Sequence, residues 1–332
     1  MENVSEALAW IASVNGYDYP PPALEAARTN QCPKPHGRHA GMLSCGVDSL
    51  AMLRLNHARY TDTHPHRISA AIAIKGFDCV TPTQQAQLLE RAHAVGKAAG
   101  IEVLDVGSNI AEVAQWPHPT RPVAEFSRRE YHACILVAAA YALSGHISSV
   151  SIAAMGVSPE VMFRQAWGSH PLIDPLYGSS SMRVFHENGT MLRFEKLRIV
   201  TEWDVGLKNL LICSNWARTE LNCGQCSKCV RSMLEFIALG KLESSPFRGR
   251  SVSAASILSM QVPTELAESA WQVLVSPLEA VGRYDLARAV QQIIREYHKR
   301  RRVKAVKERA KDLDARYLGG LAVRLNRFVR NV

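Results

Sequence analysis

The sequence predicts an α/β fold: a doubly wound, mostly parallel sheet, followed by a cysteine-rich module and a helical C-terminal extension. Short apolar segments that read as strands alternate with amphipathic segments that read as helices. This alternation is typical of a parallel sheet covered by helices on both faces. Four clustered cysteines follow the alternating region, and beyond them the pattern is helical, which defines the two appended parts.

Strands are expected where apolar and β-branched residues gather between turn signals, over residues 39–44, 68–76, 101–107 and 147–154. A first helix is expected over residues 48–56. Two further helices are expected to start at capping boxes, which pair a polar N-cap with Glu or Gln three residues later. These boxes are Thr81-Pro82-Thr83-Gln84 and Ser127-Arg128-Arg129-Glu130. After residue 156 the alternation of strands and helices ends, and residues 156–195 are expected to form a long irregular stretch. Such a stretch is usually functional in a compact domain.

The positive charge of the chain lies at its end. From Arg283 onward there are 15 basic and 5 acidic residues, a net charge of +10, within a chain whose total is +9. A basic tail on a neutral body indicates an accessory contact or a solvated helix rather than a nucleic-acid-wrapping protein. No apolar run is long enough for a membrane span, and the N-terminus lacks a secretory pattern. We therefore expect a cytoplasmic protein without a membrane partner.

The loop L-S-C-G-V-D-S-L, residues 43–50, joins the first predicted strand to the first helix. Its small residues allow backbone N–H groups to approach an anion, and the helix N-terminus adds a positive dipole. Asp48 suits such a place if a divalent cation lies between it and phosphates, which indicates Mg²⁺ with a nucleoside triphosphate. Two alternatives remain: a plain tight turn, and a Cys45 nucleophile, although Leu43 stands where a nucleophile elbow needs glycine.

The clustered cysteines have the spacing Cys213-x9-Cys223-x2-Cys226-x2-Cys229. A Cys-x2-Cys hook places two thiolates on one metal ion, and four thiolates make a closed tetrahedral Zn²⁺ site. An iron–sulfur cluster and a redox pair are the alternatives. Behind the cluster, an apolar face at helical spacing is expected to dock this module on the body: Val230, Met233, Leu234 and Ile237.

The segment S-C-G-V-D-S resembles the S-G-G-x-D-S signature of the PP-loop ATP pyrophosphatases. Ser44, Gly46, Asp48 and Ser49 match it, while Cys45 replaces the first glycine and is expected to fit with a negative φ. Together with the four cysteines, the loop resembles the 7-cyano-7-deazaguanine synthase family over roughly residues 38–240. The resemblance implies an adenine nucleotide alpha hydrolase-like fold, cleavage of ATP to AMP and pyrophosphate, and structural zinc.

The resemblance also implies roles for individual residues. The nucleotide is expected to contact the loop and the end of the second strand, at Ser44, Cys45, Gly46, Val47, Asp48, Ser49, Lys75, Gly76 and Phe77. Arg128 is expected to hold a phosphate or a substrate carboxylate, because a guanidinium binds both in a bidentate manner. Asp48, Ser49 and Lys196 are the expected catalytic residues, with Lys196 offsetting pyrophosphate charge. Residues 155–175 lack the family's Tyr-Pro-Asp stretch, so a different substrate is expected.

These observations divide the chain into an irregular lead-in (1–37), a PP-loop nucleotide-binding domain (38–210), a zinc knuckle with its docking helix (211–240) and a basic helical extension (241–332). The favoured function is an ATP-dependent synthetase that adenylates a carboxylate or amide oxygen of a small molecule. The alternatives are a tRNA-modifying sulfur transferase and a non-catalytic nucleotide-binding module. The expected cofactors are ATP, Mg²⁺ and Zn²⁺. A small-molecule substrate is favoured over tRNA, and a homodimer stays open.

Overall fold

The computed structural model describes residues 2–14, 37–77, 81–110, 130–164, 167–213 and 221–317. Contacts divide the chain into two units, Met1–Val252 and Ser253–Val332, and each is described separately below. Across the described ranges, no helix has both the length and the apolar character that crossing a membrane requires.

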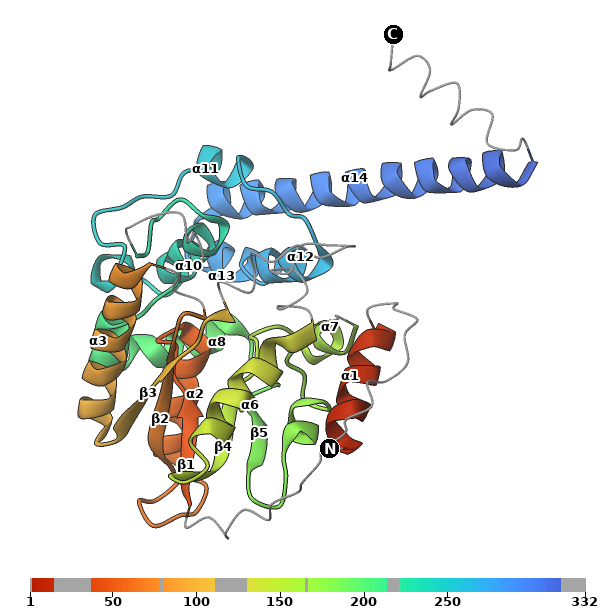
Figure 1. Cartoon of the computed structure of the whole chain (residues 1–332). Coiled ribbons are helices and arrows are strands. Elements are labelled where there is room, and N and C mark those ends of the chain that lie inside the picture. Colours follow the sequence, from red (N-terminus) through yellow and green to blue (C-terminus); the bar gives the residue numbers. More distant parts are fainter. Residues whose placement is uncertain are drawn as a thin grey trace. The chain divides into compact units, whose positions relative to one another are not determined.

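The first unit is built on a five-stranded sheet in which every pair of neighbours is parallel (Figure 1). Its strand order is β3-β2-β1-β4-β5. The strands are β1 (Arg38–Met42), β2 (Ile68–Lys75), β3 (Glu102–Gly107), β4 (Ile147–Ala153) and β5 (Arg183–Glu187). The chain runs outward from β1 to β3 and then returns to β4 on the other side of β1. The switch point of the sheet therefore lies between β1 and β4, where open α/β sheets bind ligands at the carboxyl ends of the strands.

The predicted fold class is confirmed, and the four expected strands are present with ends shifted by one or two residues. Leu43, expected within the first strand, follows β1 and still donates a backbone hydrogen bond to Ile72 (2.9 Å). The expectation of an irregular stretch over residues 156–195 was wrong in part. This stretch contains β5, the helix α7 (Pro159–Arg164) and the 3-10 turn η2 (Asp174–Tyr177).

Helices cover both faces of the sheet (Figure 1). On one face, α1 (Glu2–Val14), α6 (His132–Ala142) and η2 pack on alternate residues of the strands, such as Met42, Ile72 and Val150. The other face, which carries Gly41 and Val103, is covered by α2 (Val47–Arg59) and α3 (Pro82–Ala99), with α8 (Arg193–Thr201) packed on α2. The short helix α9 (Asp204–Lys208) follows α8.

The capping box at Thr81 is present. The Thr81 side chain accepts a hydrogen bond from the Gln84 backbone, the Gln84 side chain accepts one from the Thr81 backbone, and Pro82 opens the helix. Gly100 ends α3 in the left-handed conformation, as glycine does at this position. The second predicted box includes residues 127–129, which lie outside the described residues.

The lead-in over residues 1–37 was expected to be irregular, but residues 2–14 form α1. Ala7 and Ile11 of this helix are buried in the same apolar cluster as Tyr177 and Val184. Residues 15–36 lie outside the described part. The N-terminal segment therefore belongs, at least through α1, to the core of the first unit.

The docking helix of the cysteine module is α10 (Ser227–Ala238), followed by η3 (Leu242–Ser244). Of the expected apolar face, Val230, Met233 and Leu234 are buried and Ile237 is half-buried. Gly240 takes the left-handed conformation just after the helix. The second unit is helical, as expected: α11 (Ala254–Leu258), α12 (Glu265–Gln272), α13 (Val275–Ala280) and α14 (Tyr284–Tyr317). The first three of these helices pack on the N-terminal half of α14, whose residues beyond Tyr297 are almost all exposed.

Candidate functional site

The loop after β1 lies at the switch point of the sheet. It leads into α2, whose N-cap is Gly46 and whose first turn carries Asp48. The carboxyl end of β4 is adjacent, because β1 and β4 pair in parallel. The fold therefore brings a helix N-terminus and a small-residue loop to the place where a phosphate group would be bound.

Hydrogen bonds fix the backbone of this loop. The Ser44 hydroxyl accepts from the Gly46 N–H at 3.4 Å and lies 3.3 Å from the Ser49 hydroxyl. Ser49 in turn donates to the Gly46 carbonyl at 3.1 Å. The two serines thus hold the turn on either side of Gly46, where an added Cβ would lie 3.3 Å from Ser44 Oγ. Their roles in nucleotide binding remain predictions.

Cys45 departs from the expected backbone conformation. Its φ is +54°, whereas a negative φ was expected for a cysteine at this position. The chain reverses direction between β1 and α2 here, and the Cys45 carbonyl accepts a hydrogen bond from Leu211 N–H (2.8 Å) that holds the reversed turn. The left-handed conformation costs a residue with a side chain about 1–2 kcal/mol, whereas glycine would adopt it without that cost. The Cys45 side chain is fully buried.

Lys196 of α8 lies beside Asp48. Its ammonium is 3.3 Å from Asp48 Oδ1 and donates to the Ala154 carbonyl, just beyond β4, at 2.6 Å. The residue is fully buried, and burial lowers the pKa of Lys196, while the Asp48 carboxylate opposes this shift. A buried ammonium thus spans the switch point, joining the loop after β1 to the carboxyl end of β4. The structure brings these two predicted residues together without testing their catalytic roles.

A second cation on the same face of α8 was missed by the sequence analysis. Arg193, three residues before Lys196, lies 3.9 Å from Asp48 Oδ2 through Nη1. Its Nε is 3.5 Å from Oε1 of Glu235, and its Nη2 donates to the Ser232 hydroxyl at 3.1 Å. Glu235 is almost fully buried, and burial raises its pKa, an effect that Arg193 partly offsets. This network connects the loop to α10.

The end of β2 reaches the same edge of the sheet as the loop, because β1 and β2 are parallel neighbours. Gly76 has φ +78°, and a Cβ there would lie 2.0 Å from the Ser108 carbonyl oxygen, so this position requires glycine. Phe77 packs against the apolar core and Lys75 is exposed. Arg128 lies outside the described residues. The nucleotide contacts assigned to these four residues remain predictions.

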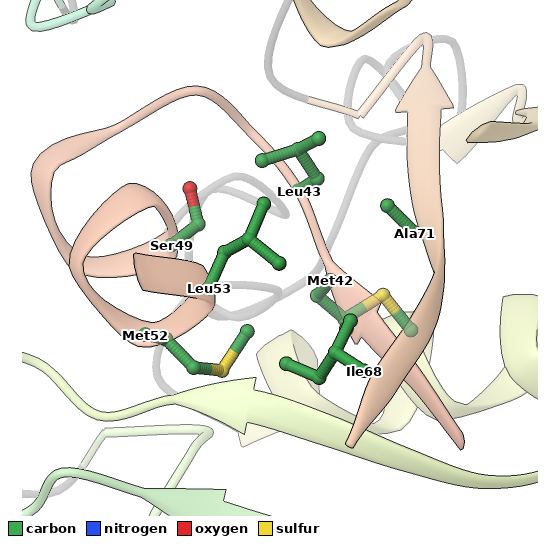
Figure 2. A pocket seen from close by; sticks show the side chains of 8 residues that line it. Met42, Leu43, Ser49, Met52, Leu53, Ile68 and Ala71 are labelled. Atoms are coloured by element: carbon green, nitrogen blue, oxygen red, sulfur yellow. The ribbon is translucent and has the colours of Figure 1, made fainter. Parts of the chain in front are cut away.

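A small hollow lies below the loop, between α2 and the strands β1 and β2 (Figure 2). Apart from Ser49 the side chains that line it are apolar, and the space between them admits no water molecule. Ligand pockets of drug-sized molecules typically measure about 300–1,000 Å³. This hollow therefore has no room for a nucleotide, and the carboxyl edge of the sheet is the better candidate.

The four cysteines converge. Their Sγ atoms all lie within 4.8 Å of one another, and the pairs Cys213–Cys226 and Cys223–Cys229 are each separated by 3.9 Å. Ligands about 2.3 Å from one tetrahedral ion lie about 3.8 Å apart. In a cubane iron–sulfur cluster each thiolate binds a different iron, so the sulfurs are spread more widely than these. The donor set and its spacing therefore fit a single tetrahedral metal ion.

The surroundings of the cysteines suit a closed site. The hydrogen bond with Cys226, followed by burial, raises the pKa of the Cys229 thiol, and a bound cation would favour the thiolate instead. Gly224 has φ +70°, and Arg250 packs against it while donating to the Cys223 carbonyl (2.9 Å). Burial lowers the pKa of Arg231 to about 10, although the guanidinium remains charged at neutral pH beside Glu235 and Cys226.

Asp174 and His186 form a buried pair within residues 156–195 that the sequence did not predict. Asp174 accepts hydrogen bonds from the Ser169 hydroxyl (2.7 Å) and the His170 N–H (2.8 Å), and it pairs with His186 Nδ1 of β5 at 2.7 Å. His186 Nε2 is buried and, within the described structure, has no hydrogen-bond partner. Arg164, in the same stretch, pairs with Glu160 on the exposed side of α7.

A second buried polar network lies on the α2 face of the sheet. The His39 ring contacts the hydroxyls of Ser149 (2.7 Å) and Ser151 (2.9 Å), and it stacks on His66 with centroids 4.5 Å apart. His66 is half-buried and pairs with Glu187 at 2.7 Å. Desolvation, with the neighbouring charges, lowers the pKa of His39 to about 3.

Comparisons with known proteins do not assign the chain to a family. No protein-family model matches the chain, and no curated protein sequence matches it. Among solved structures, the chain is similar to the U34-tRNA thiolase NcsA from Methanococcus maripaludis, determined with its 4Fe–4S cluster. The identity is 16%, the TM-score is 0.36, and the similarity covers 74% of each chain. A similarity of this size does not carry over activity, substrate or metal.

Proposed function

We propose that this chain is an ATP-dependent adenylating synthetase. The observation that carries the proposal is the pairing of Asp48 with buried Lys196 across the switch point, next to the helix N-terminus of a PP-loop-like turn. A substrate carboxylate or amide oxygen attacks the α-phosphorus of ATP, and the bond between that phosphorus and the bridging oxygen to the β-phosphate breaks. Pyrophosphate leaves, and ammonia or another nucleophile later displaces AMP.

In this proposal the residues act by position and charge. The N–H groups at the start of α2 and the cation of Lys196 stabilise the charge that develops on the leaving pyrophosphate. Asp48, whose side chain is 29% exposed, would hold Mg²⁺ through a carboxylate oxygen. The magnesium ion would supply further neutralisation of phosphate charge.

We further propose that the four cysteines hold structural Zn²⁺. Zinc prefers four-coordinate thiolate sites without an open position, and the sulfur spacing suits one such ion. Cys223, Cys226 and Cys229 would be joined by Cys213 from the segment before the knuckle. Asn222 supports this closure, because it accepts from Ile212 N–H (2.8 Å) and donates to the Leu210 carbonyl (2.9 Å).

Nucleotide binding is the first test of the proposal. Mg-ATP should bind to the full chain in a calorimetric titration, and Asp48→Asn should weaken binding about tenfold or more, since a charge-assisted contact is lost. Asp62→Asn is the matched control, because Asp62 is exposed and pairs only with Arg67 in the described structure. Equal affinities for the wild type and Asp48→Asn would refute the proposed site.

A second candidate function is sulfur transfer to tRNA. The exposed second half of α14 favours it, because residues 298–317 hold nine Lys and Arg against three Asp and Glu. Aromatic residues for base stacking are sparse there, so we expect weak, salt-sensitive RNA binding. The test compares cognate-like tRNA with random RNA at two salt concentrations, using wild type and a variant with Arg302, Lys307, Arg309 and Lys311 changed to Gln. Tight tRNA-selective binding at high salt would favour this candidate.

A further inference from the structure

The guanidinium of Arg193 connects two parts of the first unit that are far apart in the sequence. One edge faces Asp48 in the phosphate loop, and the other edges contact Ser232 and Glu235 in α10. The backbone of Arg193 is also fixed, since its N–H donates to the Gly156 carbonyl at 2.9 Å. A Cβ on Gly156 would lie 2.6 Å from the Arg193 backbone, so glycine permits this close approach.

The residues of α10 that contact Arg193 follow the cysteines in steps of three. Ser232 comes three residues after Cys229 and Glu235 three residues after Ser232, so successive members of this series are neighbours on the helix surface. Cys226 is the N-cap of α10, and Cys229 lies in its first turn. The position of Ser232 and Glu235 therefore depends on how the first turn of α10 is held.

Burial makes the connection between α8 and α10 stiff. Ser232 is 0% exposed and Glu235 is 1% exposed, so the Glu235 carboxylate depends on nearby guanidinium groups for charge compensation. Its Oε2 atom has no hydrogen-bond partner within the described structure. Loss of the Arg193 contact would therefore leave the buried carboxylate with still less compensation, which is energetically costly. When α10 shifts, Arg193 is expected to follow it and to leave Asp48.

We propose that Arg193 is a positioning residue that couples metal binding at the four cysteines to the geometry of Asp48 in the phosphate loop. The proposal rests on the proposed function for the meaning of the loop, but the coupling itself is a property of these side chains. With the metal bound, the first turn of α10 is fixed and Arg193 stays beside Asp48. After metal loss the first turn of α10 is no longer fixed, Arg193 moves away from Asp48, and Lys196 is the cation that remains beside Asp48.

Amide hydrogen exchange tests the coupling without any ligand. The purified metal-bound chain is compared with chelator-treated chain, and exchange is followed in the peptide covering residues 43–53. We expect metal removal to raise exchange in this peptide at least about fivefold in the wild type, a modest coupling between sites. Peptides from β2 serve as the internal control, because global unfolding would raise exchange there as well.

Variants of α8 make the test specific. In Arg193→Met the loop should exchange faster already with metal bound, and metal removal should change it less than about twofold. Arg198→Met is the matched control, because Arg198 is exposed on the same helix, and it should respond like the wild type. The proposal would be overturned if metal removal left amide exchange in residues 43–53 of the wild type unchanged. It would also be overturned if metal removal raised this exchange in Arg193→Met as much as in the wild type. Purified chain without metal would overturn it as well.

Mg-ATP titration gives a second measurement. The affinity of the wild type should fall about fivefold or more on metal removal, and that of Arg193→Met should not. If no form binds ATP, the proposed function fails, while the exchange result still decides the coupling. If Arg193→Met does not fold, Glu235→Gln replaces it, with exposed Glu243→Gln as control. In Glu235→Gln, metal removal should raise amide exchange in residues 43–53 less than in the wild type. A rise as large as in the wild type would contradict the coupling.

Discussion

The ammonium of Lys196 lies 3.3 Å from the carboxylate of Asp48, and both are fixed at the switch point of the parallel sheet. The two residues are 148 positions apart in the chain. Their pairing supplies a positive charge to the one acidic residue of the predicted phosphate loop. It also holds the loop to the carboxyl end of β4, because the same ammonium donates to the Ala154 carbonyl.

Lys196→Met tests this pairing, since it removes the cation and keeps most of the side-chain volume. We expect ATP turnover to fall about 10²–10³-fold, the usual loss when one preorganised electrostatic contact is removed. The Ala154 carbonyl loses its donor, so the free energy of unfolding should fall by about 1–3 kcal/mol. Rates of AMP formation and chemical denaturation measure the two effects. Lys241→Met, at an exposed position, is the control, and an unchanged rate in Lys196→Met would exclude Lys196 from the reaction.

Cys45 gives a prediction that separates strain from chemistry. Cys45→Gly removes the left-handed strain of about 1–2 kcal/mol. It also raises the conformational entropy of the unfolded chain and removes a buried thiol, and both effects lower stability. The free energy of unfolding should therefore change by less than about 1 kcal/mol. Cys45→Val should lower it by about 2 kcal/mol or more, because β-branched residues tolerate positive φ poorly. Denaturant titration measures both. If Cys45→Gly is stable yet loses all turnover, the thiol has a chemical role, and sulfur transfer gains support.

The metal prediction concerns the four cysteines. Elemental analysis of the purified chain should find one zinc per molecule, and Cys226→Ser should lose it together with much of the folding free energy, since a structural site contributes to folding directly. Cys134→Ser is the control, as Cys134 lies on α6 away from the cluster. Iron with a brown chromophore would show that the 3.9 Å sulfur spacing does not describe the metal-bound state.

His39 predicts a loss of stability in acid. Its folded-state pKa is about 3 and its ordinary value is 6.5, so the unfolded state binds more protons between these pH values. The stability from neutral His39 is present above pH 6.5 and is lost as pH falls toward 3, up to about 5 kcal/mol. His39→Gln should flatten this part of the stability–pH curve, and His93→Gln, with an exposed ring, should not. Equal slopes in the wild type and His39→Gln would contradict this account.

Much of the fold follows from local patterns. The strands β1–β4 are short apolar runs, and α3 begins at a complete capping box, so each is specified by neighbours in the sequence. The strand β5 escaped prediction because its sequence R-V-F-H-E carries polar residues whose partners are distant. Glu187 contacts His66 and Ser151, and His186 contacts Asp174. Only the fold makes these polar residues compatible with burial.

The predicted and the missed parts of the site differ in how far apart their residues lie in the sequence. The loop and the cysteines have fixed local spacings, and the structure places the cysteines together as expected. Arg193 and Glu235 are 42 residues apart and share no motif, so their contact appears only when α8 and α10 are placed. A charged residue three positions before Lys196 was the one available signal for Arg193, because that spacing puts both on one helix face.

The most direct test of the central claim is the position at which ATP is cleaved. The full metal-bound chain is incubated with Mg²⁺, α-labelled ATP and a pool of small metabolites, and the labelled products are separated. We predict labelled AMP or an AMP adduct with release of pyrophosphate. Turnover should persist when the β–γ bridge is an imido group and stop when the α–β bridge is a methylene group. Labelled ADP, or turnover of the α–β methylene analogue, would contradict the account.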